Sequence, residues 1–321
     1  MARLRLVFAA VATGLVFAAP ASASELIANR NPTAVSLEVN GKGEALITYR
    51  RETGQIRRVL AWGAVNARPP TADVPQVELR LDYAGGWGKY RTRSTAFRST
   101  YWRRFTSGAC RPYDGPQLVY FVAACKAPDG SYWGLQRWQR LQPLLGFAPW
   151  LKRHTDWELH VSHWTGPLPA LELYSHWSYG GSAVGVFGRL TFLGQPVHGF
   201  GATPTGVPLD GYGRNVYIDT YDSVYGPGWR RESGILTHRP TGTFCHSFVE
   251  QTIFRHYPGA GGSRPAAPGS RYRATVMGPG ATPVVQAETP GLGAYDRAAG
   301  EGLTRTFDSV MSGDRVCAGE R

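Results

Sequence analysis

Short stretches in which apolar and polar residues alternate recur along this chain, and they constrain its fold more than any other feature. Val35, Leu37 and Val39 alternate with polar residues, a glycine-containing turn follows at 40–43, and a second stretch begins at Ala45. Successive side chains of a strand point to opposite faces, so a period of two predicts strands with one buried face. The same pattern marks strands at 57–65, 77–82, 156–164, 170–179, 186–193, 215–222, 235–239, 243–249 and 272–277.

Glycine and proline indicate the fold class. The 321 residues include 40 Gly and 23 Pro, which are too many for a helix bundle and suit many turns between strands. We therefore expect an all-β fold, an antiparallel β-sandwich of jelly-roll type or a barrel, with long Gly/Pro loops and at most one or two short helices. One helix is predicted near 131–145, because Leu135, Trp138, Leu141 and Leu145 are spaced three or four residues apart.

Residues 1–23 have the three parts of a secretory signal peptide. Arg3 and Arg5 precede an apolar stretch at 6–19, and the small residues at 21–23 form a cleavage site. The apolar stretch is shorter than the roughly 18–20 residues that span a bilayer, and no later stretch reaches that length. We expect a chain that begins near Ser24 after cleavage and is secreted or held non-covalently at the cell surface.

The rest of the chain reads as one β domain with a tail. Strand-like stretches fill 24–257, and a Gly/Pro/Ala-rich loop or linker at 258–270 separates them from further strands of the same domain at 271–288. Residues 289–321 carry little hydrophobic patterning, so a loosely ordered tail tied by Cys317 is expected there.

The four cysteines predict two disulfides. An even number of cysteines in an exported chain is typical of a disulfide framework, and no pair here has the spacing of a zinc site. A turn signal at 111–115 favours the pair Cys110–Cys125 among the three connectivities, which leaves Cys245–Cys317 to pin the C-terminal tail.

The net charge of +12 comes mostly from arginine. A basic surface can hold a protein on an anionic polymer, but these arginines are scattered as short pairs and form no dense basic arm. We therefore expect no specific nucleic-acid binding, and a partner such as cell-wall polysaccharide or another anionic envelope polymer. A compositional bias toward Arg and Ala explains the same charge without a partner, and we favour that explanation.

Residues 156–177 are the most informative for function, because they read as a hairpin with a five-residue loop. In the simplest register Glu158 lies opposite His176. One face is then apolar and includes His163, which we interpret as a core residue. The other face gathers carboxylates, imidazoles and aromatic rings, from Glu158, His160, Ser162, Trp164, Glu172, Tyr174 and His176.

Three interpretations of this polar face stay open. The first is the solvated face of a half-buried sheet. The second is a saccharide-binding platform made by Trp164, Tyr174, His176 and Glu158. The third is an acid–base or metal site. As an acid–base site it would use the paired carboxylates of a glycoside hydrolase, and the candidate catalytic residues are Glu158, His160, Glu172 and His176. A register slip of one residue would separate the set.

Two further segments carry weaker signals. Asp210, Asn215 and Asp219 can supply oxygen ligands to calcium, but their spacing is not that of an EF-hand and turn formation is the favoured explanation, so no cofactor is predicted. Residues 226–233 are rich in Trp and Arg, which indicates a loop that contacts a partner or a phosphate, or whose Trp fills the core.

The sequence has no nucleophile elbow, HExxH motif, Walker loop or dinucleotide fingerprint. We therefore expect a secreted or cell-envelope binding protein that is not an enzyme, with carbohydrate or a cell-wall polymer as the preferred ligand. The alternatives are a secreted hydrolase that uses the Glu and His face, and a purely structural envelope protein.

Overall fold

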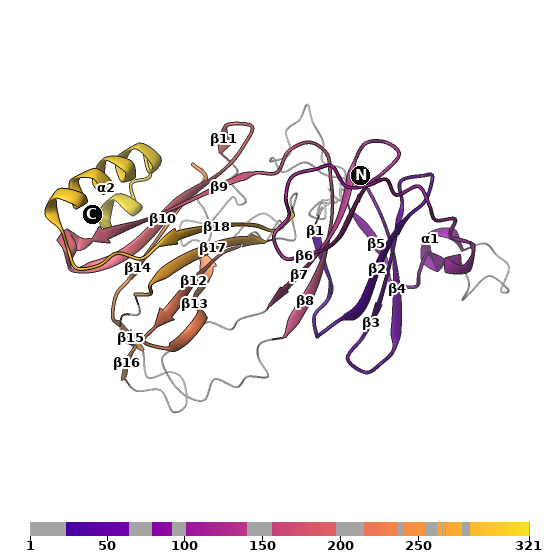
Figure 1. Cartoon of the computed structure of the whole chain (residues 1–321), viewed down its shortest axis with the longest axis horizontal. Helices are drawn as coiled ribbons and strands as arrows, with labels where there is room; N and C mark the ends of the chain where they lie inside the picture. Colours follow the sequence, from indigo (N-terminus) through magenta and orange to yellow (C-terminus); the bar gives the residue numbers. More distant parts are fainter. Residues whose placement is uncertain are drawn as a thin grey trace, which may run out of the picture.

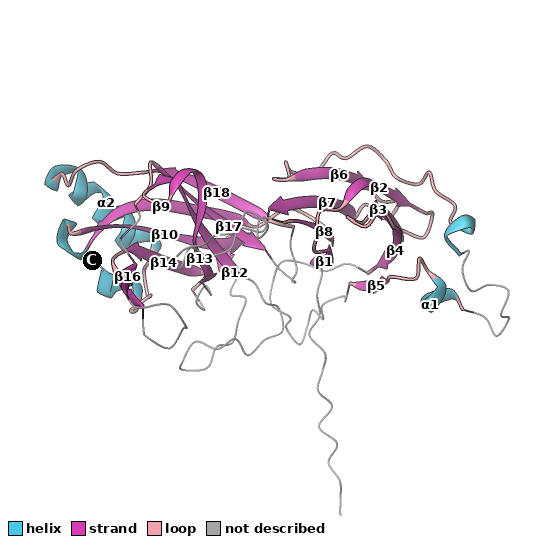
Figure 2. Ribbon diagram, turned by 90° about the horizontal axis from the view of Figure 1, so that it is seen from below, coloured by secondary structure: helices cyan, strands magenta, loops and turns pink. Residues whose placement is uncertain are grey.

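Two β-sandwiches lie side by side in the computed structural model, with the chain passing from one to the other once (Figures 1 and 2). The structure describes residues 24–63, 79–91, 101–139, 156–196, 215–236, 241–253, 262–264, 266, 268–277 and 283–320. Four four-stranded sheets and one two-stranded sheet form within these residues, with antiparallel pairing. The all-β, sandwich-like fold expected from the sequence is confirmed, whereas the expected signal peptide at 1–23 lies outside the described residues.

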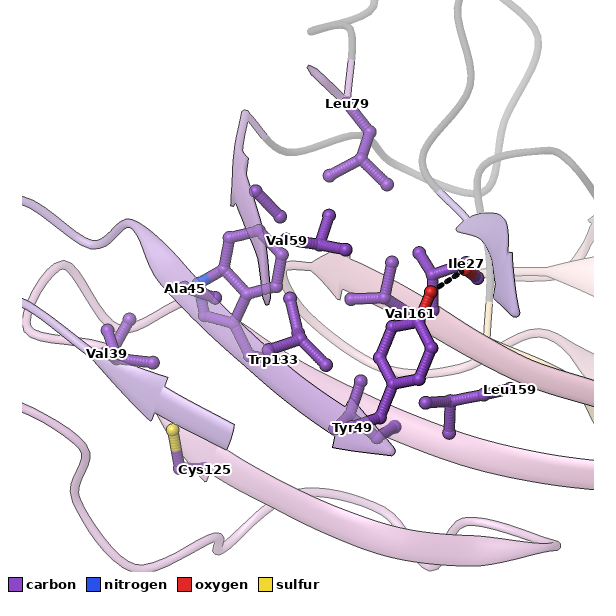
Figure 3. Packing of buried hydrophobic residues seen from close by; sticks show 14 residues of the cluster. Ile27, Val39, Ala45, Tyr49, Val59, Leu79, Cys125, Trp133, Leu159 and Val161 are labelled. Carbon is purple, nitrogen blue, oxygen red and sulfur yellow. Dashed lines mark hydrogen bonds between the residues drawn. The ribbon is translucent and has the colours of Figure 1, made fainter. Parts of the chain in front are cut away.

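The N-terminal sandwich, residues 24–164, packs two sheets face to face. The β7 sheet has the order β1 (Ser24–Ala28), β8 (Trp157–Trp164), β7 (Tyr132–Gln139), β6 (Phe121–Lys126). The β3 sheet has the order β2 (Thr33–Val39), β3 (Ala45–Arg50), β4 (Ile56–Trp62), β5 (Arg80–Asp82). Val39 and Val59 from one sheet meet Trp133, Leu159 and Val161 from the other in a single core (Figure 3).

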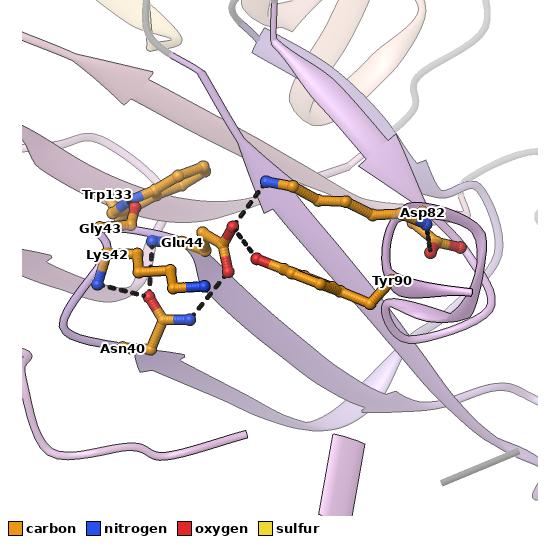
Figure 4. A network of polar contacts seen from close by, with 8 residues as sticks. Asn40, Lys42, Gly43, Glu44, Asp82, Tyr90 and Trp133 are labelled. Atoms are coloured by element: carbon orange, nitrogen blue, oxygen red, sulfur yellow. Dashed lines mark hydrogen bonds and ion pairs between the residues drawn. The ribbon is translucent and has the colours of Figure 1, made fainter. Parts of the chain in front are cut away.

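A buried carboxylate ties the Gly-rich aromatic segment after β5 to this sandwich (Figure 4). Glu44 is 5% exposed and accepts hydrogen bonds from Lys89, at 2.5 Å, and from Tyr90 on the short helix α1 (Trp87–Tyr90). Burial alone would raise the pKa of Glu44, but hydrogen bonds from Lys89, Tyr90 and Asn40 outweigh it and lower that pKa. The ionised Glu44 thus holds α1 against β3.

The C-terminal sandwich, residues 170–320, also packs two sheets. In the β10 sheet, β10 (Ala183–Phe192) pairs with β9 (Ala170–Ser178), with β14 (Thr243–Phe248) and at its end with β11 (Gln195–Pro196). The β12 sheet has the order β13 (Gly226–Leu236), β12 (Asn215–Ser223), β17 (Arg271–Met277), β18 (Val285–Pro290). Their core includes Val186, Ile218, Phe244, Phe248 and Tyr272. The strands β15 (Gln251–Ile253) and β16 (Gly262–Arg264) pair separately.

A helix covers the outer face of the β10 sheet, where the sequence led us to expect a loosely ordered tail. This helix, α2 (Arg297–Val310), begins at Asp296, whose carboxylate accepts a hydrogen bond from the Ala299 amide at 3.0 Å. Phe307 and Val310 of α2 pack on Phe187 of β10. The expectation for 289–321 was wrong because the few apolar residues of α2 all face one way, and their partner is a distant strand.

Both expected disulfides are present. Cys110–Cys125 joins the segment before β6 to β6, and Cys245–Cys317 joins β14 to the turn η5 (Cys317–Glu320) that follows α2. With sequence separations of 15 and 72 between the paired cysteines, the chain-entropy model gives about 3 and about 4 kcal/mol of stabilisation. The second disulfide thus fixes the end of the chain on the C-terminal sandwich.

The expected helix at 131–145 was wrong for its described part, because residues 132–139 form β7 and residues 140–145 lie outside the described residues. Trp133 and Leu135 point into the core of the N-terminal sandwich. On the opposite face, Trp138 packs against Val284 and Tyr217 of the C-terminal sandwich. Because both faces of β7 carry apolar residues, the spacing of these residues resembles that of a helix.

The two sandwiches are joined by a polar contact at the same strand. The Gln136 side chain donates hydrogen bonds to the carbonyls of Val119 and Val284, both at 2.9 Å, and accepts one from the Val284 amide at 2.8 Å. All hydrogen-bonding groups of this buried amide are therefore engaged, which fixes β7 against the segment that leads into β18. Within the described residues, no helix has both the length and the hydropathy to cross a membrane.

Candidate functional site

The hairpin expected at 156–177 was wrong. Its two strands exist as β8 and β9, but β8 pairs with β1 and β7, whereas β9 pairs with β10. The five residues between them connect the two sandwiches. The residues of the expected polar face are therefore divided between two separate sheets, and Glu158 does not lie opposite His176.

The half of that set on β8 is buried. Glu158, His160, Ser162 and Trp164 are 7%, 3%, 1% and 2% exposed. His160 Nε2 lies 3.3 Å from the Glu158 carboxylate, and the Trp164 ring packs against Tyr113 and Tyr132. Glu158 and His160 are thus brought together, but inside the molecule, and Trp164 presents no open platform.

The half on β9 lies on the face that α2 covers. Glu172 forms an ion pair with Arg189 at 3.1 Å, and the Tyr174 ring stacks on Phe187. His176 is 3% exposed and packs between Phe187 and Phe307, and this burial lowers its pKa to about 4. His176 is therefore neutral near neutral pH and is poorly suited to act as a general acid there.

The calcium candidates do not come together as a described site. Asp210 and the side chain of Asn215 lie outside the described residues. Asp219 is fully buried and accepts hydrogen bonds from the guanidinium groups of Arg231 and of Arg273, the latter at 2.6 Å. Two cations already neutralise this carboxylate, and within the described ranges no three His, Cys, Asp or Glu side chains are grouped as metal ligands.

One Ser–His–Asp group exists, but it is closed. Ser131 Oγ lies 2.6 Å from both His163 Nε2 and the Asp129 carboxylate. Ser131 is 2% and His163 4% exposed, and the His163 ring stacks on Trp133 with centroids 3.8 Å apart. The interpretation of His163 as a core residue is confirmed, and the buried serine is out of reach of a substrate.

An open cleft lies where β9 ends and α2 begins. It has a volume of about 480 Å³, which is within the size range of small-ligand sites. Its walls come from the end of β9, from the turn η4 (Tyr179–Gly181) and from one side of α2. His176 is the one candidate residue from the sequence that lines this cleft, at its inner end.

Two aromatic rings line this cleft. The rings of Trp177 and Tyr295 meet edge to face with centroids 5.5 Å apart, and Tyr295 is 52% exposed. Gly181 has a φ of 94°, and a Cβ there would lie 2.6 Å from the Tyr295 ring. Glycine at 181 therefore allows both the turn and the close approach of Tyr295.

Charged side chains form the rim. Arg297, Glu301 and Arg305 follow one another at four-residue intervals along α2, so they share one face of the helix, and all three line the cleft. All three are exposed. The cleft thus combines aromatic rings with hydrogen-bond donors of both arginines and one carboxylate acceptor.

No protein-family model, curated protein or solved structure matches this chain. The geometry of the cleft is therefore the basis for a functional assignment. The sequence pointed to neither Tyr295 nor Trp177 as a ligand-binding residue, since Trp177 was placed on the apolar face and Tyr295 in the tail. One sequence signal could have predicted this helix face. It is the capping residue Asp296, followed by charged residues four apart at Arg297, Glu301 and Arg305.

Proposed function

We propose that this protein is a secreted binding protein for a carbohydrate or cell-wall polymer, and that its binding site is the cleft between β9 and α2. The observation that carries the proposal is the pairing of the Trp177 and Tyr295 rings with a rim of Arg297, Glu301 and Arg305. The rings can stack on the apolar face of a sugar ring, while the charged side chains bind its hydroxyl groups.

The composition of the cleft favours binding over glycoside hydrolysis. Among the described residues that line it, Glu301 is the one carboxylate, whereas a glycosidase places two carboxyl groups across the scissile bond. The carboxylates that the sequence suggested for this chemistry, Glu158 and Glu172, belong to different sandwiches. Two disulfides are compatible with export to an oxidising compartment.

The proposal is tested by binding the exported protein to insoluble polysaccharides and isolated cell-wall material at low and high salt. Stacking contacts are insensitive to ionic strength, so binding should persist at high salt. Tyr295→Ala should weaken it by at least about tenfold, equivalent to about 1.4 kcal/mol, with little loss of stability because the ring is half exposed.

Phe121→Ala is the matched control, since Phe121 is 57% exposed on β6 and lies in the other sandwich. Its binding should equal that of the unsubstituted protein. Equal binding by the Tyr295→Ala protein, or binding that disappears at high salt in every variant, would contradict the proposed site and leave only general electrostatic adhesion. Release of soluble sugars during the assay would instead support the hydrolase alternative.

A further inference from the structure

A second cleft, of about 490 Å³, opens in the N-terminal sandwich. One wall is the edge strand β1 with the residues that follow it, and the other is the hairpin of β3 and β4 with Tyr83. The Tyr49 hydroxyl donates to the Ile27 carbonyl at 2.9 Å across the base (Figure 3). The Tyr83 hydroxyl donates to the Leu26 carbonyl at 3.4 Å near the rim.

Arginine dominates the charge of this cleft. Arg30, Arg51 and Arg57 line it, and Glu52 is the one acidic residue among the described lining residues. Both tyrosine hydroxyls already donate to backbone carbonyls. The guanidinium groups are therefore the principal hydrogen-bond donors that remain for a ligand.

These arginines are only weakly engaged by the protein itself. Arg30 lies 3.8 Å from Glu52 and 3.6 Å from Asp156, and both Arg30 and Glu52 are more than half exposed, so these ion pairs contribute little. Arg51 donates to the side chain of Gln55 at 3.2 Å. The side chain of half-buried Arg57 forms no hydrogen bond or ion pair with another described residue.

Arg51 and Arg57 converge on the base of the cleft. Burial raises the pKa of Tyr49, and the positive charges of Arg57 and Arg51 act in the opposite direction. Arg57 lies directly opposite Tyr49 in the register of β3 and β4, and Arg51 follows Tyr49 by two residues, so the three side chains are on one face of this hairpin. Two or three guanidinium groups around one concave space present the donor geometry that matches the two oxygens of a carboxylate or phosphate.

We propose that this cleft binds an oxyanion, a carboxylate or phosphate group carried by a sugar, with Arg57 and Arg51 as its main donors and Arg30 at the rim. Tyr83 is 47% exposed and supplies a ring surface for the sugar. The site is separate from the β9–α2 cleft and does not depend on the proposed function. A polymer with anionic sugar units can engage both sandwiches.

The test is calorimetric titration of the whole exported protein with glucose 6-phosphate, glucuronate and neutral glucose. The two charged probes separate the phosphate from the carboxylate form of the ligand, and binding of either one supports the proposal. Arg57→Gln and, independently, the more exposed Arg51→Gln should each weaken that binding about tenfold, equivalent to about 1.4 kcal/mol. Equal binding of glucose, or no binding of either charged probe, would overturn the proposal.

Two further variants separate a built site from general charge. Arg111→Gln removes the same charge from an exposed position of the N-terminal sandwich outside the cleft and should leave affinity unchanged. Glu52→Gln removes the competing carboxylate and should tighten binding severalfold at low salt. An equal loss in Arg111→Gln would show that only the net charge matters, and weaker binding in Glu52→Gln would contradict an anion held by the arginines beside Glu52. Tyr295→Ala should not affect this titration, so failure of one site is distinguishable from failure of the other.

Discussion

The β3 sheet and the β10 sheet differ in how fully their second face is covered, and that difference decides how well their sequences can be read. The β3 sheet buries one face in the sandwich core, and on the other it buries Leu46 and Leu60 but leaves polar residues such as Ser36 and Thr48 exposed or half-buried. The β10 sheet buries one face in the sandwich core and the other under α2, where Phe187 is fully buried. Alternation of polar and apolar residues reports solvent exposure only in the first case.

The two sandwiches also differ in how they neutralise buried charge. In the N-terminal sandwich, the buried carboxylate of Glu44 is paired with a single cation, Lys89. The C-terminal sandwich surrounds the buried Asp219 with both Arg231 and Arg273, and Arg231 lies over the rings of Trp138 and Tyr217 at 4.9 and 4.5 Å. The uncompensated positive charge of this cluster faces aromatic rings at the junction with the other sandwich.

Asp219→Asn should therefore have the largest effect on stability, a loss of about 4 kcal/mol, because it leaves two buried guanidinium groups without a counter-ion. The measurement is urea-induced unfolding followed by circular dichroism. Glu288→Gln is the control, since it likewise replaces a carboxylate by its amide at an exposed position of the same sheet, on β18, and should cost less than about 1 kcal/mol. Similar losses of stability in the two variants would show that the buried cluster contributes no more to stability than an exposed ion pair.

Phe307→Ala tests whether the covered outer face of the β10 sheet is a second core. Phe307 is 2% exposed and contacts His176 and Phe187, so its truncation should cost about 3 kcal/mol. Phe121→Ala, at a ring that is 57% exposed, should cost less than about 0.5 kcal/mol in the same unfolding assay. A small loss for Phe307→Ala would mean that α2 contributes little and that the face is open in solution.

The strands with one solvated face were the ones that the sequence predicted well. β2, β3 and β4 lie within a few residues of their expected positions, because short turns at 40–43 and 52–54 separate clear alternations. Residues 226–233 were expected to form a loop but belong to β13. Arg231 packs over the Trp138 ring and Trp229 lies under the Arg273 guanidinium, so these residues do not alternate with apolar ones. Neither local pattern nor composition reveals such a partner.

The candidate site was predictable only in part, because its walls come from distant segments. His176 was singled out from its own strand, and it does line the β9–α2 cleft. Tyr295 and Arg305 belong to the segment where few apolar residues suggested a loose tail, although Leu303, Phe307 and Val310 are spaced as one helix face. The prediction of a hairpin at 156–177 was wrong because a five-residue connection between two strands does not by itself require that they pair.

His163 and His176 give the last and smallest test of the contrast between the sandwiches. Burial lowers the pKa of each to about 4 from an ordinary value of 6.5. His163 is hydrogen-bonded to Ser131 and to the Gly63 carbonyl, whereas His176 Nε2 has no hydrogen-bond partner among the described residues. At pH 7.5, His163→Leu should therefore cost about 2 kcal/mol and His176→Leu less than about 0.5 kcal/mol.

The pH dependence should be similar for both histidines. The unfolded chain binds a proton at each imidazole near pH 6.5 and the folded chain only near pH 4. The contribution of each neutral, buried histidine to the free energy of unfolding is therefore fully present above pH 6.5. It is lost as the pH falls toward 4, by up to about 1.4 kcal/mol per pH unit. Either substitution should flatten the stability curve in this window, as measured by urea unfolding at a series of pH values. Parallel curves for a variant and the unsubstituted protein would mean that the replaced histidine is accessible to protons in the folded state, and for His176 that α2 does not seal the face on which it lies.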